Sequence, residues 1–132
     1  MVKSAFRPSD DSCTFPYFVP GNAMLAVNLQ RTSEMIQNKN QDLSSRLLNL
    51  SKQIQEDIYL RGTTKDANGK KIFAYEVDGL DKFLIMDDAN IPNLMSLPYL
   101  GFLDKNDEIY VNTRKAILDK TQNPYFFEGK DG

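Results

Sequence analysis

The clearest pattern in the chain is a stripe of aliphatic residues with helical spacing between positions 43 and 58. Its members recur every three or four residues: Leu43, Leu47, Leu50, Ile54 and Ile58. Polar Ser, Lys, Gln and Glu side chains lie opposite this stripe, so the pattern predicts an amphipathic helix with one buried face. Asn40 or Asp42 is placed to cap its start, and Gly62 supplies a stop signal at its end.

Two further stretches have helical patterns. The sequence AMLAVNLQRTSEMIQ (residues 23–37) carries a broad apolar stripe, and Asn22 precedes it as the predicted N-cap. The stretch NDEIYVNTRKAILDK (residues 106–120) has Asn106 as its predicted cap, acidic residues in its first turn and basic residues near its end. The residues expected to face inward in this last helix are Ile109, Thr113, Ala116 and Ile117.

The region between the helices has the character of short strands and turns. Asn68-Gly69 is a strong turn signal. The β-rich runs that follow predict strands at 71–77 and 82–86, which together form a small hairpin. Pro92 at a first-turn position predicts a short helix from residue 92 to about Pro98. The fold class predicted from the residues is therefore mainly α, built from helical hairpins, with a small β-hairpin insertion.

Composition narrows the possible functions. The 132 residues are 41% hydrophobic and 26% charged, with a net charge of −2 and no basic cluster. This balance argues against nucleic acid as a partner, and the short apolar runs predict no membrane contact from this chain. The chain has no histidine, and Cys13 is its one cysteine, so neither a disulfide nor a Ser-His or Cys-His pair can form within it. Chemistry would have to rest on carboxylates, Arg, Lys and Tyr.

Two adjacent aspartate pairs, Asp10-Asp11 and Asp87-Asp88, lie in loops beside apolar residues. One interpretation is structural, because Asp side chains bind nearby backbone amides in turns and caps. The other is a general acid or base, since apolar surroundings and a like-charged neighbour both raise a carboxyl pKa. Arg7 would have the opposite effect on its nearest carboxylate and would keep it ionised.

These loops also allow two ligand hypotheses. A metal site would use the oxygen donors Asp10, Asp11, Asp87, Asp88 and Asn90, but their spacing does not match a Ca²⁺ loop, so we predict neither a metal nor another cofactor. A sugar site would use the same acids with Arg, Asn and the many aromatic side chains. Most of the aromatic residues are nevertheless expected to fill the core, and Cys13 is expected to act as a small hydrophobic residue.

Four segments resemble consecutive blocks of glycoside hydrolase family 125. They are FRPSDDSCTFPYFVPGNAM, FAYEVDGL, LIMDDANIPNLMSLPYLGF and NTRKAIL followed by NPYFFEGK, in the order and spacing of the family. The resemblance implies a metal-independent exo-α-mannosidase that cleaves α-1,6 linkages with inversion. It also implies an (α/α)6 barrel with the active site in the loops at one end, and a mannose-containing oligosaccharide or N-glycan as substrate.

The resemblance also implies roles for individual residues. The RPSDD block corresponds to the part of the family that supplies the general acid, which we assign to Asp11 with Asp10 as the close alternative. Arg7 would hold substrate hydroxyls or tune this acid. The candidate sugar contacts in the second loop are Asp87, Asp88 and Asn90, and Glu76 is a weaker candidate.

An (α/α)6 barrel contains far more helices than this sequence predicts. We therefore expect residues 1–132 to be a fragment of a single catalytic domain, with the base and the N- and C-terminal parts of the barrel elsewhere. Alone, the fragment is expected to be inactive and poorly stable, because its outer helices lack neighbours. The alternative is a non-catalytic carbohydrate-binding module, or a truncated relic of the same fold.

Overall fold

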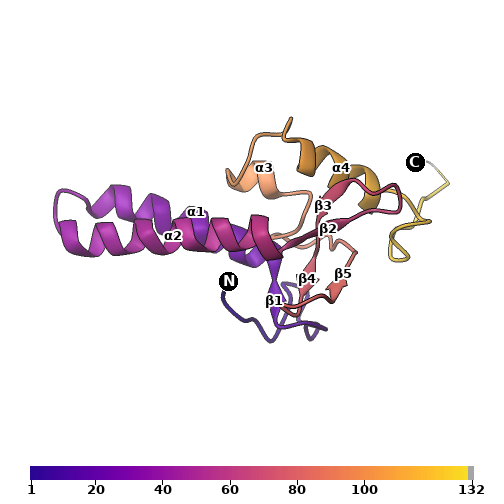
Figure 1. The fold of residues 1–132 in the computed structure, drawn as a ribbon, viewed down its shortest axis with the longest axis horizontal. Coiled ribbons are helices and arrows are strands. Elements are labelled where there is room, and N and C mark those ends of the chain that lie inside the picture. Colours follow the sequence, from indigo (N-terminus) through magenta and orange to yellow (C-terminus); the bar gives the residue numbers. More distant parts are fainter. Residues whose placement is uncertain (131–132) are drawn as a thin grey trace.

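The computed structural model describes residues 1–130 and consists of a long helical hairpin joined to a region of small sheets and short helices (Figure 1). The hairpin is formed by α1 (Val19–Ile36) and α2 (Gln41–Arg61). The prediction of a mainly helical chain with a small β component is confirmed. None of the described helices combines the length and the apolar character needed to cross a membrane.

Helix α1 begins four residues earlier than predicted, at Val19 rather than Ala23. Pro20 occupies its first turn, where the missing N–H of proline costs nothing, and no side chain caps the helix. The predicted cap, Asn22, is instead buried within the helix. Its side-chain amide donates to the carbonyl oxygens of Val2 and Phe18, and its oxygen accepts the N–H of Val2. Asn22 therefore fastens the N-terminal segment to α1.

Helix α2 begins and ends as predicted, but its buried face is different. The amide of Leu43 donates to Oδ1 of Asn40 at 3.0 Å, and Gly62 closes the helix by donating to the carbonyl of Ile58. Ile58 is buried, whereas Leu43 and Leu50 are 39% and 43% exposed. Within this chain the aliphatic stripe is therefore only partly buried, toward its Ile54–Ile58 end.

Small polar residues explain this difference, because they line the contact between the two helices. Ser51 Oγ donates to the carbonyl of Ala26 at 2.7 Å, and the hydroxyls of Ser33 and Ser44 lie 3.0 Å apart. Side chains of this size let the helices approach closely, and the larger leucines are left at the flanks.

The strands form two separate antiparallel sheets. One pairs β2 (Thr63–Lys65) with β3 (Lys71–Phe73) across the Asn68-Gly69 turn, where Gly69 has a φ of 77°. The other has the order β1-β4-β5, with these members: β1 (Tyr17–Phe18), β4 (Glu76–Val77) and β5 (Phe83–Leu84). The predicted strand 71–77 is thus two strands in different sheets. The sequence analysis missed β1 and β2, which are too short to show a clear alternation.

Two short helices complete the fold, α3 (Leu97–Leu100) and α4 (Glu108–Ile117). The helix predicted from residue 92 begins only at Leu97, because residues 92–96 form turns held by side-chain acceptors. The cap of α4 is Asp107 rather than Asn106, since the amide of Tyr110 donates to Asp107 Oδ1 at 3.0 Å. Its inward residues follow the prediction: Thr113, Ala116 and Ile117 are buried and Ile109 is half-buried.

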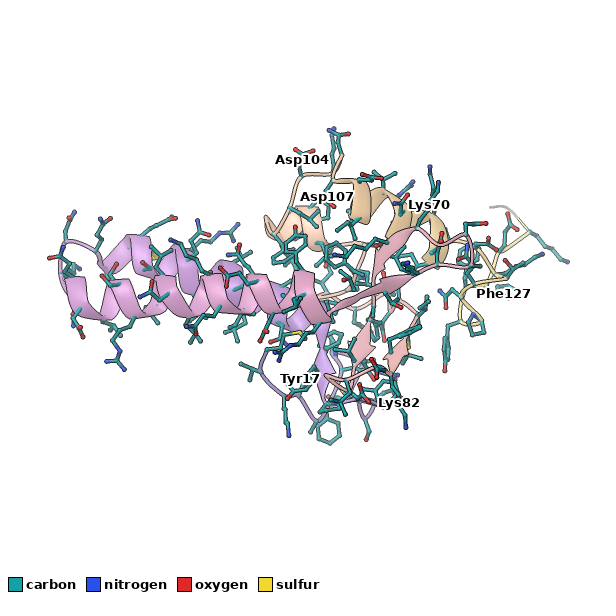
Figure 2. All side chains as sticks on the ribbon, in the orientation of Figure 1. Tyr17, Lys70, Lys82, Asp104, Asp107 and Phe127 are labelled. Atoms are coloured by element: carbon teal, nitrogen blue, oxygen red, sulfur yellow. The ribbon has the colours of Figure 1, made fainter. Side chains whose placement is uncertain are left out.

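The core lies where the base of the hairpin meets the sheets, α3 and α4. Its fully buried members include Val19, Ile58, Phe73, Tyr75, Leu94 and Leu97. Side chains crowd this junction, whereas many of those on the hairpin extend outward from it (Figure 2). The junction also carries the loops that contain the predicted site residues.

Candidate functional site

The candidate site is built around Glu76, a carboxylate with no exposed surface in the short strand β4. Its Oε1 accepts a 2.6 Å hydrogen bond from Nε of Arg7. Its Oε2 accepts the backbone N–H groups of Thr14 at 2.7 Å and Phe15 at 2.9 Å. Burial of a charge is tolerated when it is paired and hydrogen-bonded in this way. Glu76, which the sequence offered as a weaker sugar contact, is thus enclosed by groups of the protein itself.

Arg7 is the cationic half of this pair and is itself largely covered, with 12% of its side chain exposed. The hydrogen bond to Glu76 raises the pKa of Arg7 above its usual value, and the charge of Glu76 adds to this effect. Its guanidinium carbon lies 5.7 Å from the centre of the Tyr75 ring, within reach of a cation–π interaction. Arg7 also donates to Oγ1 of Thr14 at 3.3 Å. Its orientation is therefore fixed from several sides.

The first aspartate pair lies at the tip of a tight turn that begins at Arg7. The amide of Asp10 donates to the carbonyl of Arg7 at 3.1 Å, and the amide of Arg7 donates to the carbonyl of Asp11 at 2.8 Å. Asp10 has a φ of 65°, a left-handed conformation that Asp tolerates better than most residues. Both side chains are exposed, and Ser9 Oγ donates to Oδ2 of Asp11 at 2.9 Å.

The two residues of the second aspartate pair, Asp87 and Asp88, have different roles. Asp87 accepts the amides of Leu94 at 2.7 Å and Met95 at 3.0 Å, so it caps the turn before α3. Burial raises the pKa of Asp87 to about 6, although these amides act in the opposite direction. Asp88 accepts the backbone and side-chain N–H groups of Asn90. The amide of Asn90 is the main cause that lowers the pKa of Asp88, and Ser9 and the charge of Arg7 contribute.

The two aspartate loops are therefore neighbours, although 76 positions separate Asp11 from Asp87 along the chain. The charge of Arg7 in the first loop lowers the pKa of Asp88 in the second, and the charges of Arg7 and Asp88 both act on the pKa of Tyr75. The structure brings together Arg7, Glu76 and Asp88, and it carries Asp10 and Asp11 on the same turn as Arg7. Asn90 is exposed and oriented by Asp88.

Tyr75 is a member of this cluster that the sequence analysis did not single out. It is fully buried and packs edge-on against Phe18 at 5.0 Å between ring centres. Its hydroxyl has no hydrogen-bond partner within residues 1–130. Burial is the main cause that raises the pKa of Tyr75, followed by the charges of Asp88 and Asp87. Its place beside Glu76 in the YEV stretch was the available signal, although the same stretch also has the pattern of an ordinary strand.

The described residues offer little to a metal ion. Residues 1–130 contain no group of three or more His, Cys, Asp or Glu side chains placed to hold one. Cys13 is half-buried, and burial raises the pKa of its thiol, which keeps it in the less reactive protonated form. The arrangement is suited to acid–base chemistry or to binding hydroxyl groups.

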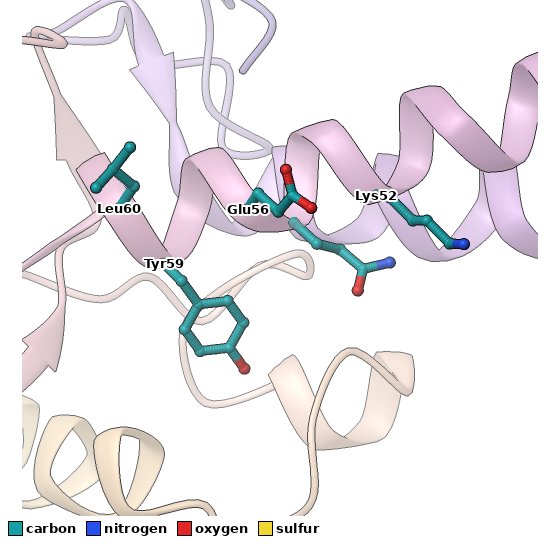
Figure 3. Close-up of a pocket in the computed structure, with 5 residues that line it drawn as sticks. Lys52, Glu56, Tyr59 and Leu60 are labelled. Atoms are coloured by element: carbon teal, nitrogen blue, oxygen red, sulfur yellow. The ribbon is translucent and has the colours of Figure 1, made fainter.

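Two hollows are relevant to binding. The larger, of about 590 Å³, lies on α2 and is lined by Lys52, Gln55, Glu56, Tyr59 and Leu60, so it includes none of the predicted site residues (Figure 3). The smaller, of about 310 Å³, includes Asp87 and Asp88 together with aromatic side chains of the C-terminal segment, among them Tyr125 and Phe127. Carboxylates beside aromatic faces are a combination that sugars use.

Comparisons with known proteins agree on one family. Residues 1–132 match the sequence profile described as metal-independent alpha-mannosidase (GH125). The chain is 47% identical over 131 residues to the meiotically up-regulated gene 157 protein of Schizosaccharomyces pombe, covering 98% of this chain and 26% of that protein. A solved structure of a Streptococcus pneumoniae metal-independent alpha-mannosidase, in a non-productive complex with α-1,6-mannobiose, superimposes with a TM-score of 0.94. It is 41% identical, and the match covers all of this chain and 32% of that one. The chain thus spans about a quarter to a third of these relatives.

Proposed function

The chain belongs to the GH125 family of metal-independent α-mannosidases, and on that premise we propose that it forms part of an enzyme that removes terminal α-1,6-linked mannose from oligosaccharides such as N-glycans. The observation that carries this proposal is the match along all 132 residues, together with 41% identity to a mannosidase whose structure holds α-1,6-mannobiose. The enclosed Arg7–Glu76 pair beneath an exposed aspartate turn supports it.

In the proposed mechanism Asp11, with Asp10 as the alternative, is the general acid. Its carboxyl proton passes to the glycosidic oxygen as the bond from that oxygen to C1 breaks. A carboxylate outside this chain removes a proton from water, and the water oxygen bonds to C1 from the opposite face of the sugar. Inversion requires space for this water, so the two carboxyl groups would lie about 6.5–9.5 Å apart.

The neighbouring polar residues would bind the sugar. We assign Arg7, Asp87, Asp88 and Asn90 to the mannose hydroxyls, because the hydrogen-bonding groups of these two loops converge. Asp87 and Asp88 also border the hollow with the aromatic side chains, which suits one polar edge and one apolar face of a sugar ring. No cofactor is needed for this chemistry.

We further propose that residues 1–132 are one piece of a single (α/α)6-barrel domain. The relatives are three to four times longer than the chain, as the covered fractions of 26% and 32% imply. Leu43, Leu50 and Leu60 are exposed along α2, as expected for a helix with a neighbour elsewhere in a longer protein.

The test is to follow hydrolysis of α-1,6-mannobiose by the longer protein and to record by NMR which anomer of mannose is released first. The β anomer is expected, and initial release of the α anomer would exclude an inverting mechanism. In parallel, Asp11→Asn should lower kcat roughly 10²- to 10⁴-fold, the usual contribution of a general acid. A loss of this size in Asp10→Asn, with Asp11→Asn close to the wild type, would transfer the role to Asp10.

A further inference from the structure

The turn that carries Asp10 and Asp11 belongs to a loop with two arms that lie side by side. The amide of Cys13 donates to the carbonyl of Ala5 at 2.9 Å, and Phe6 and Ser12 form an isolated antiparallel bridge. These bonds hold the arms to each other. They do not, however, determine where the loop as a whole lies on the protein.

Glu76 provides that second constraint because it binds both arms at once. Through Oε1 it holds the side chain of Arg7, which leads into the turn. Through Oε2 it holds the amides of Thr14 and Phe15, which follow the turn. The buried carboxylate of Glu76 therefore links this loop to strand β4, which lies more than 60 positions later in the sequence.

Glu76 is itself well anchored. Its strand β4 lies in the middle of the β1-β4-β5 sheet, and Glu76 pairs with Phe18 on one side and Leu84 on the other. Its neighbours in the chain, Tyr75 and Val77, are buried. The sheet thus acts as the frame on which the aspartate turn is mounted.

The bonding requires a carboxylate at this position. Three N–H groups converge on Glu76, and an ionised carboxylate has two acceptor oxygens to receive them. Glutamine has the same shape but only one acceptor oxygen. Its NH₂ group would face either Arg7 or the two amides, and donors in that orientation repel one another.

We infer that Glu76 is a positioning residue of the glycosidase reaction: it holds Asp10 and Asp11 in place against the bond to be cleaved without touching the sugar itself. This inference rests on the proposed function. It gives Glu76 a role different from the sugar contact expected from the sequence. A displacement of the acid by about 1 Å costs roughly 100-fold in rate.

The test compares two substrates of the longer protein. Fluoride leaves α-mannosyl fluoride with little need for a proton, whereas the mannose leaving group of α-1,6-mannobiose requires one. Glu76→Gln is expected to lower kcat on mannobiose by roughly 100-fold and on the fluoride by far less, with KM little changed. Glu76→Asp keeps the charge and should recover part of the loss on mannobiose.

Thr113→Val is the matched control for lost stability. The hydroxyl of Thr113 is a buried acceptor for the amide of Phe73, and it lies outside the site. This variant should lower the melting temperature yet leave the ratio of the two kcat values unchanged. The inference is overturned if Glu76→Gln lowers kcat equally on both substrates. A change in KM alone would also overturn it, because an unchanged kcat means that the acid is still in place without Glu76.

Hydrogen exchange provides a measurement that does not depend on turnover or on the folding of Glu76→Gln. In Glu76→Asp the amides of Thr14 and Phe15 should exchange faster than in the wild type, while the amide of Phe73 stays protected. Unchanged exchange at Thr14 and Phe15 would refute the positioning role. If the wild-type enzyme releases no mannose from either substrate, the proposed function itself fails, a result distinct from any defect of the variants.

Discussion

The helical hairpin and the aspartate loops are stabilised in different ways. In the hairpin, residues 19–61, many side-chain contacts join positions close in sequence, such as Asn40 with Leu43 and Ser33 with Ser44, while Arg31 and Asp57 connect it to Leu100 and to the N-terminus. In the loops, Glu76 contacts residues 61 to 69 positions away. The hairpin extends from the rest of the molecule as an arm, whereas the loops fold onto the junction (Figure 1).

This difference separates what local sequence determines from what the assembled fold determines. In the hairpin the ends of α2 follow from the local signals Asn40 and Gly62, and Leu43, Leu50 and Leu60 are exposed along this helix. The loops have little regular structure, yet their polar groups find partners within this chain. The loop that carries the proposed general acid is therefore held by contacts within this chain.

The largest loss of unfolding free energy is expected from removing a contact in the loops that joins residues distant in the sequence. Glu76→Ala leaves the largely covered guanidinium of Arg7 without its anion and two amides without an acceptor. Breaking a buried ion pair from one side costs about 3–5 kcal/mol of unfolding free energy. Ser51→Ala in the hairpin removes one buried hydrogen bond and should cost about 1 kcal/mol. Urea unfolding of the longer protein measures both, and equal losses would contradict the comparison.

The next prediction concerns aliphatic residues along α2. Ile58 is fully buried at the base of the hairpin, so Ile58→Ala should cost about 2–5 kcal/mol wherever it is measured. Leu50 is 43% exposed in this chain, so Leu50→Ala should cost much less in residues 1–132 alone. In the longer protein the cost of Leu50→Ala should rise toward that of Ile58→Ala, because a further helix would cover it.

Comparison of residues 1–132 with the longer protein also tests the expectation that residues 1–132 alone are inactive and poorly stable. We expect no mannose release and a broad thermal transition, measured by circular dichroism. A sharp two-state melt of the monomer, with Leu50→Ala equally mild in both proteins, would show that the hairpin needs no neighbour. Measurable activity would place both catalytic carboxylates within this chain.

Sequence analysis predicted the elements that depend on local rules. Helix α2 with Asn40, one of its two candidate caps, and its stop Gly62, and the inward face of α4, followed from residue type and spacing. Prediction from the sequence failed where contacts between residues that are distant in the sequence determine the local structure. Asn22 is used to hold Val2 instead of capping α1, and the buried serines displace Leu43 and Leu50 from the interface. The start of the short helix moved to Leu97 because polar side chains hold the preceding turn.

The candidate site shows the same division. The sequence identified Arg7, Glu76 and the aspartate pairs as polar residues beside apolar ones, and family resemblance gave them roles. It could not show that Glu76 accepts the amides of Thr14 and Phe15, since backbone partners have no sequence signature. Nor could it show that Tyr75 lies beneath Arg7, because a buried tyrosine in a strand-like run is unremarkable.

The dependence of stability on pH tests the opposite pKa shifts of Asp87 and Asp88, the two adjacent carboxyls of the second loop. An aspartate in an unfolded chain has a pKa of about 3.9, while burial raises that of Asp87 to about 6 in the folded protein. Between these values the folded state holds a proton that the unfolded state has released, so stability should fall as pH rises through this window. Asp88 has a lowered pKa, so its contribution should instead be lost as pH falls below about 4.

The measurement is the melting temperature of the longer protein against pH, with Asp87→Asn and Asp88→Asn as paired variants. Asp87→Asn should flatten the decline between about pH 4 and pH 6, whereas Asp88→Asn should change the curve only at the acidic end. The loss of an acceptor for Leu94 or Met95 gives Asp87→Asn a constant offset, which does not alter the slope. Parallel curves for the wild type and Asp87→Asn would mean that Asp87 is ionised when folded.

The smallest loss of stability is expected at the far end of the hairpin, where Asn40 makes a local capping contact. Asn40→Ala removes the acceptor for the amide of Leu43 and should cost about 1 kcal/mol, whereas Asn40→Gly should cost only a few tenths. Asp42→Asn is the control, because the 3.9 Å pair of Asp42 with Arg46 is exposed and contributes little. Hydrogen exchange in the first turn of α2 should rise in Asn40→Ala, while the amides of Thr14 and Phe15 stay protected. Loosening of those two amides would mean that the hairpin tip and the aspartate loops unfold together, and the separation between local and long-range stabilisation would not hold.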